Sequence, residues 1–471
     1  MFENDEIEGP GVGSGVELGE LQKALSAGYG QGVSDAGSGI GALRVESLEA
    51  SLKVLTFGTQ HMLCWKKIPK DPAFSTVEEY AQLTSVGDEN NSGFAPEGTA
   101  PEEDDSVYAR KASLVKFLGT TRKVTHPATL VRQLGSPAVE RESKNGILKV
   151  MRDAEFGLFW GNSDLCYNPT VVEGVEWDGL NKLIDADNDI DLGNRNMEEG
   201  DVGDLAERIY SSYGFMNELF CSPKVLQTTG KISLPKERIV LPTASGGIQL
   251  GIDIGTFKTQ YGVINPNADI FLSTGRSPKK TAPASATSAK APTAPASIAD
   301  AVMTGTTLGK WRSSQYGAAI KLKATACNRF GESAPTAASD GTTVTSSDPL
   351  KHIPITITNA ASVVTVPEYF NIYATEPGGS VYYLVAQVAA SSQANDGTTL
   401  YDYTGYIMPN TSMAFGLDMT RDVLAFKQLA PIMKMDLAVV EPAYRFMILL
   451  YGVLQLFAPK KAGRIVNIKD N

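Results

Sequence analysis

The run from Tyr444 to Ile468, YRFMILLYGVLQLFAPKKAGRIVNI, constrains the fold of this chain more than any other segment. Apolar residues dominate from Phe446 to Ala458, and Pro459 and two lysines follow them. The run is shorter than the about 20 apolar residues that a membrane-spanning helix needs, and it is too continuous for a strand with one wet face. It therefore predicts a long strand, or a bent pair of strands, covered on both sides.

Size and composition are those of a protein that can bury a substantial core. The 471 residues suggest about three domains, and 42% of them are hydrophobic and 20% charged. The formal net charge of −11 argues against a sequence-independent grip on nucleic acid, which depends on Lys and Arg. The N-terminal MFENDEIEG does not resemble a secretory signal, and no segment qualifies as a membrane span.

The cysteines and histidines lack the spacing of a disulfide framework, a metal site or a nucleophile–histidine pair. They are Cys64, Cys166, Cys221 and Cys327, and His61, His126 and His352. We expect four unpaired, mostly buried thiols, in a protein made in a reducing compartment. We expect no catalytic residues, no cofactor and no metal.

The N-terminal part predicts an arm followed by a hairpin. Residues 1–41 contain eleven glycines, which favour a mobile or partner-ordered arm, with a short helix at Leu18–Ser26. Alternating apolar residues in Ser51–Trp65 predict extended structure with one buried face. The polar segment Asp88–Asp105 and the strand-like run Ser113–Val124 then complete a long projecting hairpin. The acidic residues Glu102, Glu103, Asp104 and Asp105 are expected to be a solvated loop, not a cation site.

Two helices are predicted in the next part. The first follows Ser136 as N-cap and Pro137, and ends near Trp160 and Gly161 after about 24 residues. The second spans Val202–Tyr213 behind Asp201 as a possible cap. Residues 217–276 favour short strands, with turns at Ser222-Pro223 and Gly246-Gly247.

A change of composition marks an insertion. Of the 21 residues from Ser277 to Ser297, 18 are Ala, Pro, Ser or Thr, which is typical of a linker. Residues 298 to about 392 alternate at period two, which predicts a separate β-sandwich of about 100 residues. The polar stretch Ser391–Thr398 is expected to lead back to the main body.

Several segments resemble the major capsid proteins of large contractile-tailed bacteriophages. They are GILKVMRDAEFGLFWGNSDL, YGFMNELFCSPKVL, GTFKTQYGVINPNADIFL and FKQLAPIMKMDLAVVEPAYRFMILLYGVLQLFAPKKAGRIVNI. The resemblance covers about 350 residues as a pattern without one diagnostic motif. It implies an α+β chain with the Hong Kong 97 capsid fold, in which the long helix is the spine helix.

The resemblance also implies a domain organisation. It comprises an N-terminal arm (1–60), an extended-loop region (61–125), a peripheral domain (126–220 and 430–471), an axial domain (221–276 and 400–429), a linker (277–297) and an inserted sandwich (298–398). KATACNRFGESAP is similar to a fibronectin type III strand and turn, and EYFNIYATEPGGSVYYLVAQV resembles a further hairpin of that class. The insertion is therefore expected to be immunoglobulin-like and to face outward.

The implied function is structural. Such a subunit assembles into homo-hexamers and homo-pentamers of an icosahedral head, which encloses double-stranded DNA without sequence-specific contact. Its partners would be itself, portal and scaffolding proteins and possibly decoration proteins, with no membrane, and it would assemble in the host bacterial cytoplasm. Two alternatives remain open: the shell of an encapsulin-like compartment, and a surface adhesion or carbohydrate-binding protein that acts through its sandwich.

Four local features remain unassigned. GIDIGTFKT, with Asp253, Gly255 and Thr256, imitates a phosphate loop of actin-like ATPases, and GPGVGSG is Gly-rich. Neither has the surrounding motifs of a nucleotide site, so we expect none. Lys111, Lys116 and Lys123 lie where relatives form cross-links, but no partner Asn aligns. ALSAGYG, Ala24–Gly30, has the small residues that maturation proteases prefer.

Overall fold

The computed structural model describes residues 58–88, 94–101, 103–131, 137–165, 167–168, 173–233, 255–360, 367–390, 397–438 and 441–470. Thr56–Leu130 and Ala138–Asn471 form one compact unit. The expected arm, its helix at Leu18–Ser26 and the segment Ala24–Gly30 lie outside the described residues. None of the helices in the described ranges is long and apolar enough to cross a membrane.

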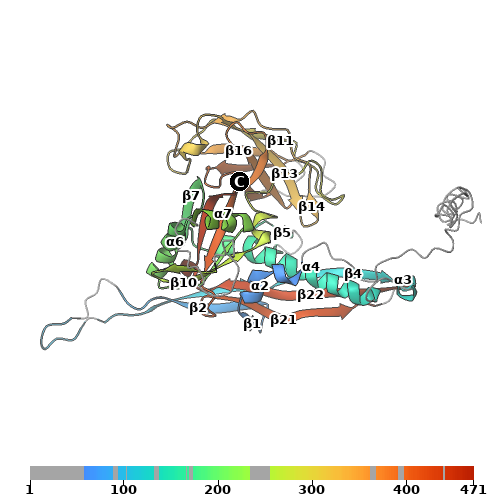
Figure 1. Cartoon of the computed structure of the whole chain (residues 1–471), viewed down its shortest axis with the longest axis horizontal. Coiled ribbons are helices and arrows are strands. Elements are labelled where there is room, and N and C mark those ends of the chain that lie inside the picture. Colours follow the sequence, from blue (N-terminus) through green and yellow to red (C-terminus); the bar gives the residue numbers. More distant parts are fainter. Residues whose placement is uncertain are drawn as a thin grey trace, which may run out of the picture. The chain divides into compact units, whose positions relative to one another are not determined.

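The long helix is present where the sequence predicts it. α4 (Ala138–Trp160) has 23 residues and begins directly after Pro137, whereas Ser136 lies outside the described part. Val150, Ala154 and Leu158 are buried at a spacing of four residues, which places them on one face of the helix. Figure 1 shows α4 lying along strands β4 and β22.

A four-stranded sheet lies under α4. Its order is β1 (Lys70–Pro72), β21 (Leu424–Asp436), β22 (Ala443–Leu456) and β4 (Lys116–Thr125). β1 runs parallel to β21, and the other pairs are antiparallel. The predicted long strand is therefore confirmed as β22. Its coverage is only partly as predicted, because 444–451 alternates between buried and more accessible positions and only 452–456 is buried throughout.

A six-stranded sheet forms the second layer of the body. Its order is β7 (Asp189–Arg195), β23 (Gly463–Lys469), β20 (Thr411–Leu417), β8 (Glu218–Cys221), β10 (Gly262–Ala268) and β9 (Phe257–Thr259). A separate core joins this sheet to α6 (Glu199–Ser211) and α7 (Pro223–Ser233). The strands come from both ranges expected as the peripheral and axial domains.

The second predicted helix is confirmed as α6, which begins three residues before Val202. Asp201 lies inside the first turn, where its carboxylate accepts a hydrogen bond from the backbone N–H of Glu198 in a capping box. The strands expected throughout 217–276 are wrong for 223–233, which is helix α7. The turn expected at Gly246-Gly247 lies outside the described residues.

The extended structure expected in Ser51–Trp65 is wrong where the chain is described. Thr59–His61 is a 3-10 turn, η3, and Leu63–Lys67 is helix α2. Cys64 and Trp65 are buried, and the Trp65 ring lies edge-on to Phe426 with ring centroids 5.0 Å apart. A buried helical turn therefore replaces the expected strand.

The hairpin is formed by β2 (Val77–Ser85) and β3 (Val107–Leu114), paired from Val77–Leu114 to Ser85–Val107. Its arms are shorter than expected, because the chain leaves the hairpin at Val115 and continues as β4 in the four-stranded sheet. The polar tip lies where the sequence predicts it.

Residues 297–403 contain two larger antiparallel sheets around a core of their own, besides the short antiparallel pair of β12 (Ala319–Ile320) and β15 (Thr342–Thr343). One is β11 (Ser297–Asp300), β16 (Ile353–Thr358) and β19 (Thr398–Tyr403). The other is β14 (Gly331–Glu332), β13 (Leu322–Asn328), β17 (Tyr369–Thr375) and β18 (Tyr382–Ala389). We call this pair of sheets the sandwich. The chain does not return to the body at Thr398, because β19 first completes the three-stranded sheet.

The remaining elements are short. They are α3 (His126–Leu130), α5 (Leu180–Leu183), β5 (Tyr167–Asn168), β6 (Glu173–Gly174), β12 (Ala319–Ile320), β15 (Thr342–Thr343), η4 (Ala186–Asn188), η6 (Ile270–Ser273), η7 (Ser313–Gln315) and η8 (Pro459–Lys461). The Ala/Pro/Ser/Thr-rich segment 277–297 contributes only the start of β11, but it is bonded to the sandwich. Ala282 N–H donates to Tyr382 O at 2.9 Å, and Thr287 N–H donates to Glu332 O at 2.9 Å.

Candidate assembly surfaces

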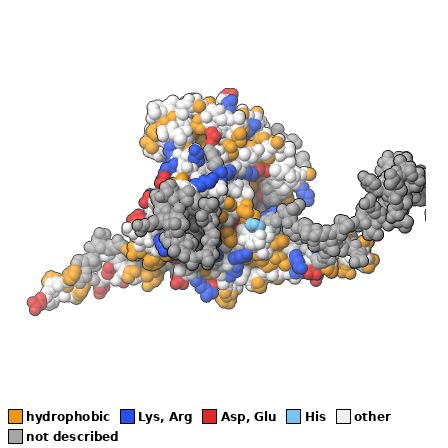
Figure 2. All heavy atoms as spheres, viewed as in Figure 1, with side chains coloured by type: hydrophobic (Ala, Val, Ile, Leu, Met, Phe, Trp, Pro, Cys, Tyr) orange, Lys and Arg blue, Asp and Glu red, His pale blue; other side chains and the backbone are white. Residues whose placement is uncertain are grey.

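The β2–β3 hairpin presents apolar side chains to solvent. Phe94 near the tip is 95% exposed and Tyr108 on β3 is 70% exposed, and Leu83, Val86 and Val107 are exposed as well. Figure 2 shows hydrophobic side chains along this hairpin and an acidic group at its far end. A two-stranded hairpin is marginally stable alone in water, and contiguous exposed apolar surface marks a binding site. The hairpin is therefore a candidate contact with another protein surface.

The base of the hairpin is tied to the body. The Tyr80 ring lies edge-on to Phe457 with centroids 5.0 Å apart, and the Gln82 side-chain amide donates to the Phe457 carbonyl. The Gln455 side-chain amide donates to the Glu78 carbonyl at 3.3 Å. These contacts fix where the hairpin leaves the body, while the segment beyond Leu83 stays accessible.

The four-stranded sheet has one face that α4 leaves open. Phe446, Ile448 and Leu450 of β22 point towards the helix, where a Cβ at Gly146 would collide with Ile448. The alternate residues point the other way and are only partly covered. This open sheet face consists of Met433 and Met435 on β21, Met447, Leu449 and Tyr451 on β22, and Phe117 on β4.

Register places these side chains side by side. Met435 pairs with Met447, Met433 with Leu449, and Tyr451 with Phe117, whose rings meet edge-on at 5.0 Å. Phe117 is 61% exposed. Methionine suits such a surface because its flexible thioether adapts to a partner's shape. The open sheet face is thus a second candidate contact.

Charged groups surround both surfaces. Glu103, Asp104 and Asp105 are exposed at the hairpin, as predicted, and Asp104 accepts hydrogen bonds from Asp88 N–H at 2.9 and 3.0 Å; Glu102 lies outside the described residues. Of the lysines near the hairpin, Lys111 is exposed, Lys116 is buried, and Lys123 bonds to Glu441 at 2.6 Å. The structure therefore brings no two of the candidate lysines into one site.

A buried pair of carboxyl groups, which the sequence does not reveal, lies where α4 meets α2. Glu155 is fully buried and accepts hydrogen bonds from the backbone N–H groups of Cys64 at 2.7 Å and Trp65 at 2.6 Å. Asp269, also fully buried, accepts from Phe271 N–H at 2.8 Å. Burial, and then the hydrogen bond and like charge of Asp269, raise the pKa of Glu155 to about 9. The pair links three segments distant in sequence.

The thiols are buried and unpaired where described. Cys64, Cys221 and Cys327 are free and buried, and burial is the first cause that raises the pKa of each, to about 12 for Cys221 and Cys327. Cys166 lies outside the described residues. Within the described ranges, His, Cys, Asp and Glu form no group of three or more able to hold a metal ion.

The imitation of a phosphate loop is only partly described. Asp253 lies outside the described residues, and Gly255 and Thr256 lead directly into β9, the edge strand that forms a hairpin with β10. No helix follows Gly255 and Thr256, although the phosphate loops of P-loop and dinucleotide-binding folds open one. The strand-and-turn interpretation of GIDIGTFKT therefore fits the described part.

Comparison with known proteins identifies relatives that are described as major capsid proteins. The family model described as "SU10 major capsid protein" matches residues 58–282. The "Major capsid protein" of Staphylococcus phage S25-3 is 26% identical over 457 residues, which cover 96% of this chain and 95% of the relative. The "Putative major capsid protein" of Enterococcus phage phiEF24C is 27% identical over the same shares of the two chains.

Solved structures give more distant likenesses. The capsid of a native GTA particle has a TM-score of 0.46 at 8% identity, over 93% of this chain and 100% of the other. The capsid of Myoviridae phage XM1 has a TM-score of 0.44 at 7% identity, over 90% and 97%. The holo-SrpI encapsulin of Synechococcus elongatus has a TM-score of 0.41 at 8% identity, over 91% and 93%. At this distance none of them bears on function.

Proposed function

Because this chain belongs to the phage major capsid proteins, a structural family and not an enzyme family, we propose that it builds the hexamers and pentamers of an icosahedral head around double-stranded DNA. A closed shell from one kind of chain needs self-contacts that repeat by rotation. The observation that carries the proposal is the hairpin, whose apolar side chains Leu83, Val86, Val107 and Tyr108 are exposed to solvent.

The contact would join two surfaces of different copies. The hairpin of one subunit would lie on the open sheet face of a neighbour, where Phe117, Leu449 and the methionines offer apolar area. Such a contact is heterologous, because it joins two different surfaces. It produces a closed ring only if the rotation that relates neighbouring copies returns to the first copy.

In this proposal the body has the Hong Kong 97 fold. The hairpin would be the extended loop and α4 the spine helix. The four-stranded sheet with α4 would be the peripheral domain, and the six-stranded sheet with α6 and α7 the axial domain. If each strand is assigned to the domain of its sheet, β7, β8 and β23 belong to the axial domain. The domain boundaries expected from the sequence place them in the peripheral domain, apart from the last residue of β8.

The sandwich would be an immunoglobulin-like domain displayed on the outer surface. Its separate core and the placement of KATACNRFGESAP on β13 and β14 support that class. The net charge of −11 would limit adhesion of the wall to packaged DNA. Portal, scaffolding and decoration proteins would be further partners, in a particle assembled in the host bacterial cytoplasm.

The test is assembly of the purified chain, followed by sedimentation velocity and negative-stain electron microscopy. The parent chain is expected to form closed shells. Tyr108→Asp places a charge in the hairpin and should leave folded, unassembled subunits. The control is Leu400→Asp, because Leu400 lies in a strand of the sandwich and is 72% exposed, close to the 70% of Tyr108.

Two results would contradict the proposal. One is a parent chain that stays monomeric under every assembly condition. The other is a Tyr108→Asp chain that forms shells as readily as the Leu400→Asp chain, since the hairpin contact would then be dispensable. Double-stranded DNA inside authentic particles distinguishes a phage head from an encapsulin-like compartment.

A further inference from the structure

The chain enters and leaves the sandwich at one place. Asn410 N–H, on the way out, donates to the carbonyl of Pro278, on the way in, at 3.2 Å. Beside this crossing, the Lys279 ammonium group bonds to Asp470 O at 2.8 Å and to its carboxylate at 3.0 Å. Two adjacent chain connections restrain the position of an inserted domain, but they leave it free to tilt and rotate about the crossing.

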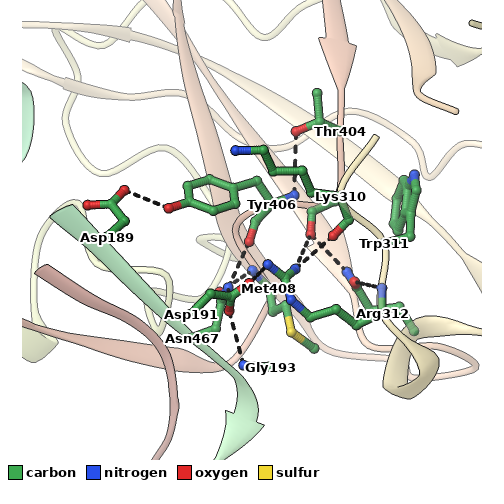
Figure 3. Close-up of polar contacts among 12 residues, drawn as sticks. Asp189, Asp191, Gly193, Lys310, Trp311, Arg312, Thr404, Tyr406, Met408 and Asn467 are labelled. Atoms are coloured by element: carbon green, nitrogen blue, oxygen red, sulfur yellow. Dashed lines mark hydrogen bonds and ion pairs between the residues drawn. The ribbon is translucent and has the colours of Figure 1, made fainter. Parts of the chain in front are cut away.

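A third connection lies away from the two chain crossings. The loop 309–316 of the sandwich reaches strand β7 of the body, where the Arg312 guanidinium pairs with the Asp191 carboxylate. Asp191 also accepts hydrogen bonds from the side-chain amide of Asn467 at 2.7 Å and from Gly193 N–H at 3.0 Å. Figure 3 shows Arg312 directed at Asp191, with Asn467 beside it. Three donors from three segments thus meet one carboxylate.

Tyr406 extends this contact to a second carboxylate. Its hydroxyl donates to Asp189 at 2.6 Å, and the Arg464 guanidinium bonds to the same carboxylate at 2.6 and 2.7 Å. The ring of Tyr406 lies below the Lys310 ammonium, 4.5 Å from the ring centroid, and within 6.0 Å of the Arg312 guanidinium. Cation–π contacts of this kind add to the ion pair where water is partly excluded. We call Asp189, Asp191, Arg312, Tyr406, Arg464 and Asn467 the junction cluster.

The loop that carries Arg312 is itself held rigidly. Its neighbour Trp311 is buried, donates from its indole N–H to Lys351 O at 2.6 Å, and lies edge-on to Tyr403 at 5.3 Å. Gly405 adopts a φ of 71° directly against the Trp311 ring, where a Cβ would collide. The backbone that carries Arg312 is therefore a fixed support, and little backbone entropy remains to be lost when Arg312 pairs with Asp191.

We propose that the junction cluster orients the sandwich, so that it is carried as a fixed projection of the body and not as a tethered domain that swings. The chain crossing supplies the attachment, and the pair Arg312–Asp191 removes the remaining rotation. The role concerns this chain's own geometry and holds whether or not the subunits form shells.

Spin-label distances across the junction test the orientation. Labels at the exposed positions 207 on α6 and 380 on the sandwich, introduced as Glu207→Cys and Ser380→Cys, report the spread of body-to-sandwich distances when labelled chains are diluted with unlabelled ones. Arg312→Ala is expected to broaden this distribution. Arg329→Ala is the matched control, because Arg329 pairs with Glu368 at 3.1 Å inside the sandwich and should leave the distribution unchanged.

Hydrogen exchange on the same full-length variants separates loss of orientation from loss of folding. In Arg312→Ala and in Asp191→Asn, which keeps acceptors for Gly193 and Asn467, amides of 309–316 and 404–410 should exchange roughly tenfold faster. Amides of β13 and β17 should keep their protection. Unchanged distances in Arg312→Ala, or an equal rise in exchange throughout β13 and β17, would overturn the proposal.

Discussion

Replacing Asp269 by Asn is expected to reduce the pH dependence of this protein's stability near neutrality. Glu155 and Asp269 are both fully buried, and burial together with Asp269 raises the pKa of Glu155 from 4.5 to about 9. Between those values the folded chain keeps a proton that the unfolded chain releases. The contribution of Glu155 to the free energy of unfolding is therefore complete below about pH 4.5, and it is lost as pH rises towards about 9.

The magnitude follows from linkage. Each pH unit in that window lowers the free energy of unfolding by about 1.4 kcal/mol, or about 3 kcal/mol between about pH 6 and 8. Lys70 is partly buried near the pair, and burial lowers its pKa, which opposes this slope. In Asp269→Asn the amide oxygen can still accept from Phe271 N–H, while the amide N–H can donate to Glu155. Glu155 can then ionise at lower pH, and the slope should flatten.

The assay is urea unfolding followed by tryptophan fluorescence at several pH values in this window. The parent's midpoint should fall as pH rises, and that of Asp269→Asn should fall less steeply, because burial still raises the pKa of Glu155 whereas the contribution of Asp269 is gone. Glu155→Gln is a second variant with a different signature. Its amide N–H₂ faces one of the two backbone N–H groups, which should cost about 1–3 kcal/mol relative to the parent at low pH, and because Gln does not titrate this difference should shrink as pH rises. A parent slope that persists in Asp269→Asn would refute the reasoning.

Three other predictions follow from the core, the thiols and the chain crossing. Phe415→Ala removes a fully buried ring that packs against Phe159 and Trp160, so unfolding should become easier by ~3–5 kcal/mol, measured by urea denaturation. A thiol reagent should not label the buried cysteines until the chain unfolds, because burial disfavours the thiolates of Cys64, Cys221 and Cys327. Mass mapping of labelled peptides checks this prediction, and rapid labelling of the native chain would contradict it. Replacing 279–409 with a short Gly/Ser linker should preserve assembly, because Pro278 and Asn410 are hydrogen-bonded; a folded product unable to form shells would show that the sandwich is needed.

The last of these predictions changes a deletion that the sequence alone suggests. The sequence pattern places the end of the inserted sandwich at residue 398, after the polar stretch Ser391–Thr398. β19 pairs with β16 along its whole length, so a cut at residue 398 would leave one sandwich strand attached to the body. The hydrogen bond between the chain crossings gives the better boundary.

The sequence predicted those helices and strands whose signals lie within the element itself or in the residues next to it. Pro137 and apolar residues at helical spacing are enough for α4, and a continuous apolar run is enough for β22. α7 was missed although it carries the same kind of signal. Ser222 caps it by accepting from Val225 N–H at 3.3 Å, and Pro223 is its first residue. A Ser-Pro pair is compatible with a turn or a helix start, and only the residues after it decide.

Contacts between distant segments could not be predicted. Glu155 and Asp269 belong to separate elements, and the residues around either one do not point to the other. The same holds for Asp191 and Arg312, which meet only because β7 and the sandwich loop face each other. α2 was mistaken for a strand because two turns of helix are too short to display a 3.6-residue period. Pattern reasoning therefore located the hairpin, but not the open sheet face beside it.

The order of strands has a consequence for synthesis. β22 lies between β21 and β4, and β23 lies between β7 and β20, so both sheets need strands that come later in the chain than every neighbour they join. A nascent polypeptide on the ribosome cannot complete the four-stranded sheet until Leu456 has emerged from the exit tunnel, or the six-stranded sheet until Lys469 has emerged. Translation itself would thus delay the native subunit until β22 and β23 have been made, and polysomes would carry few copies able to associate before that point.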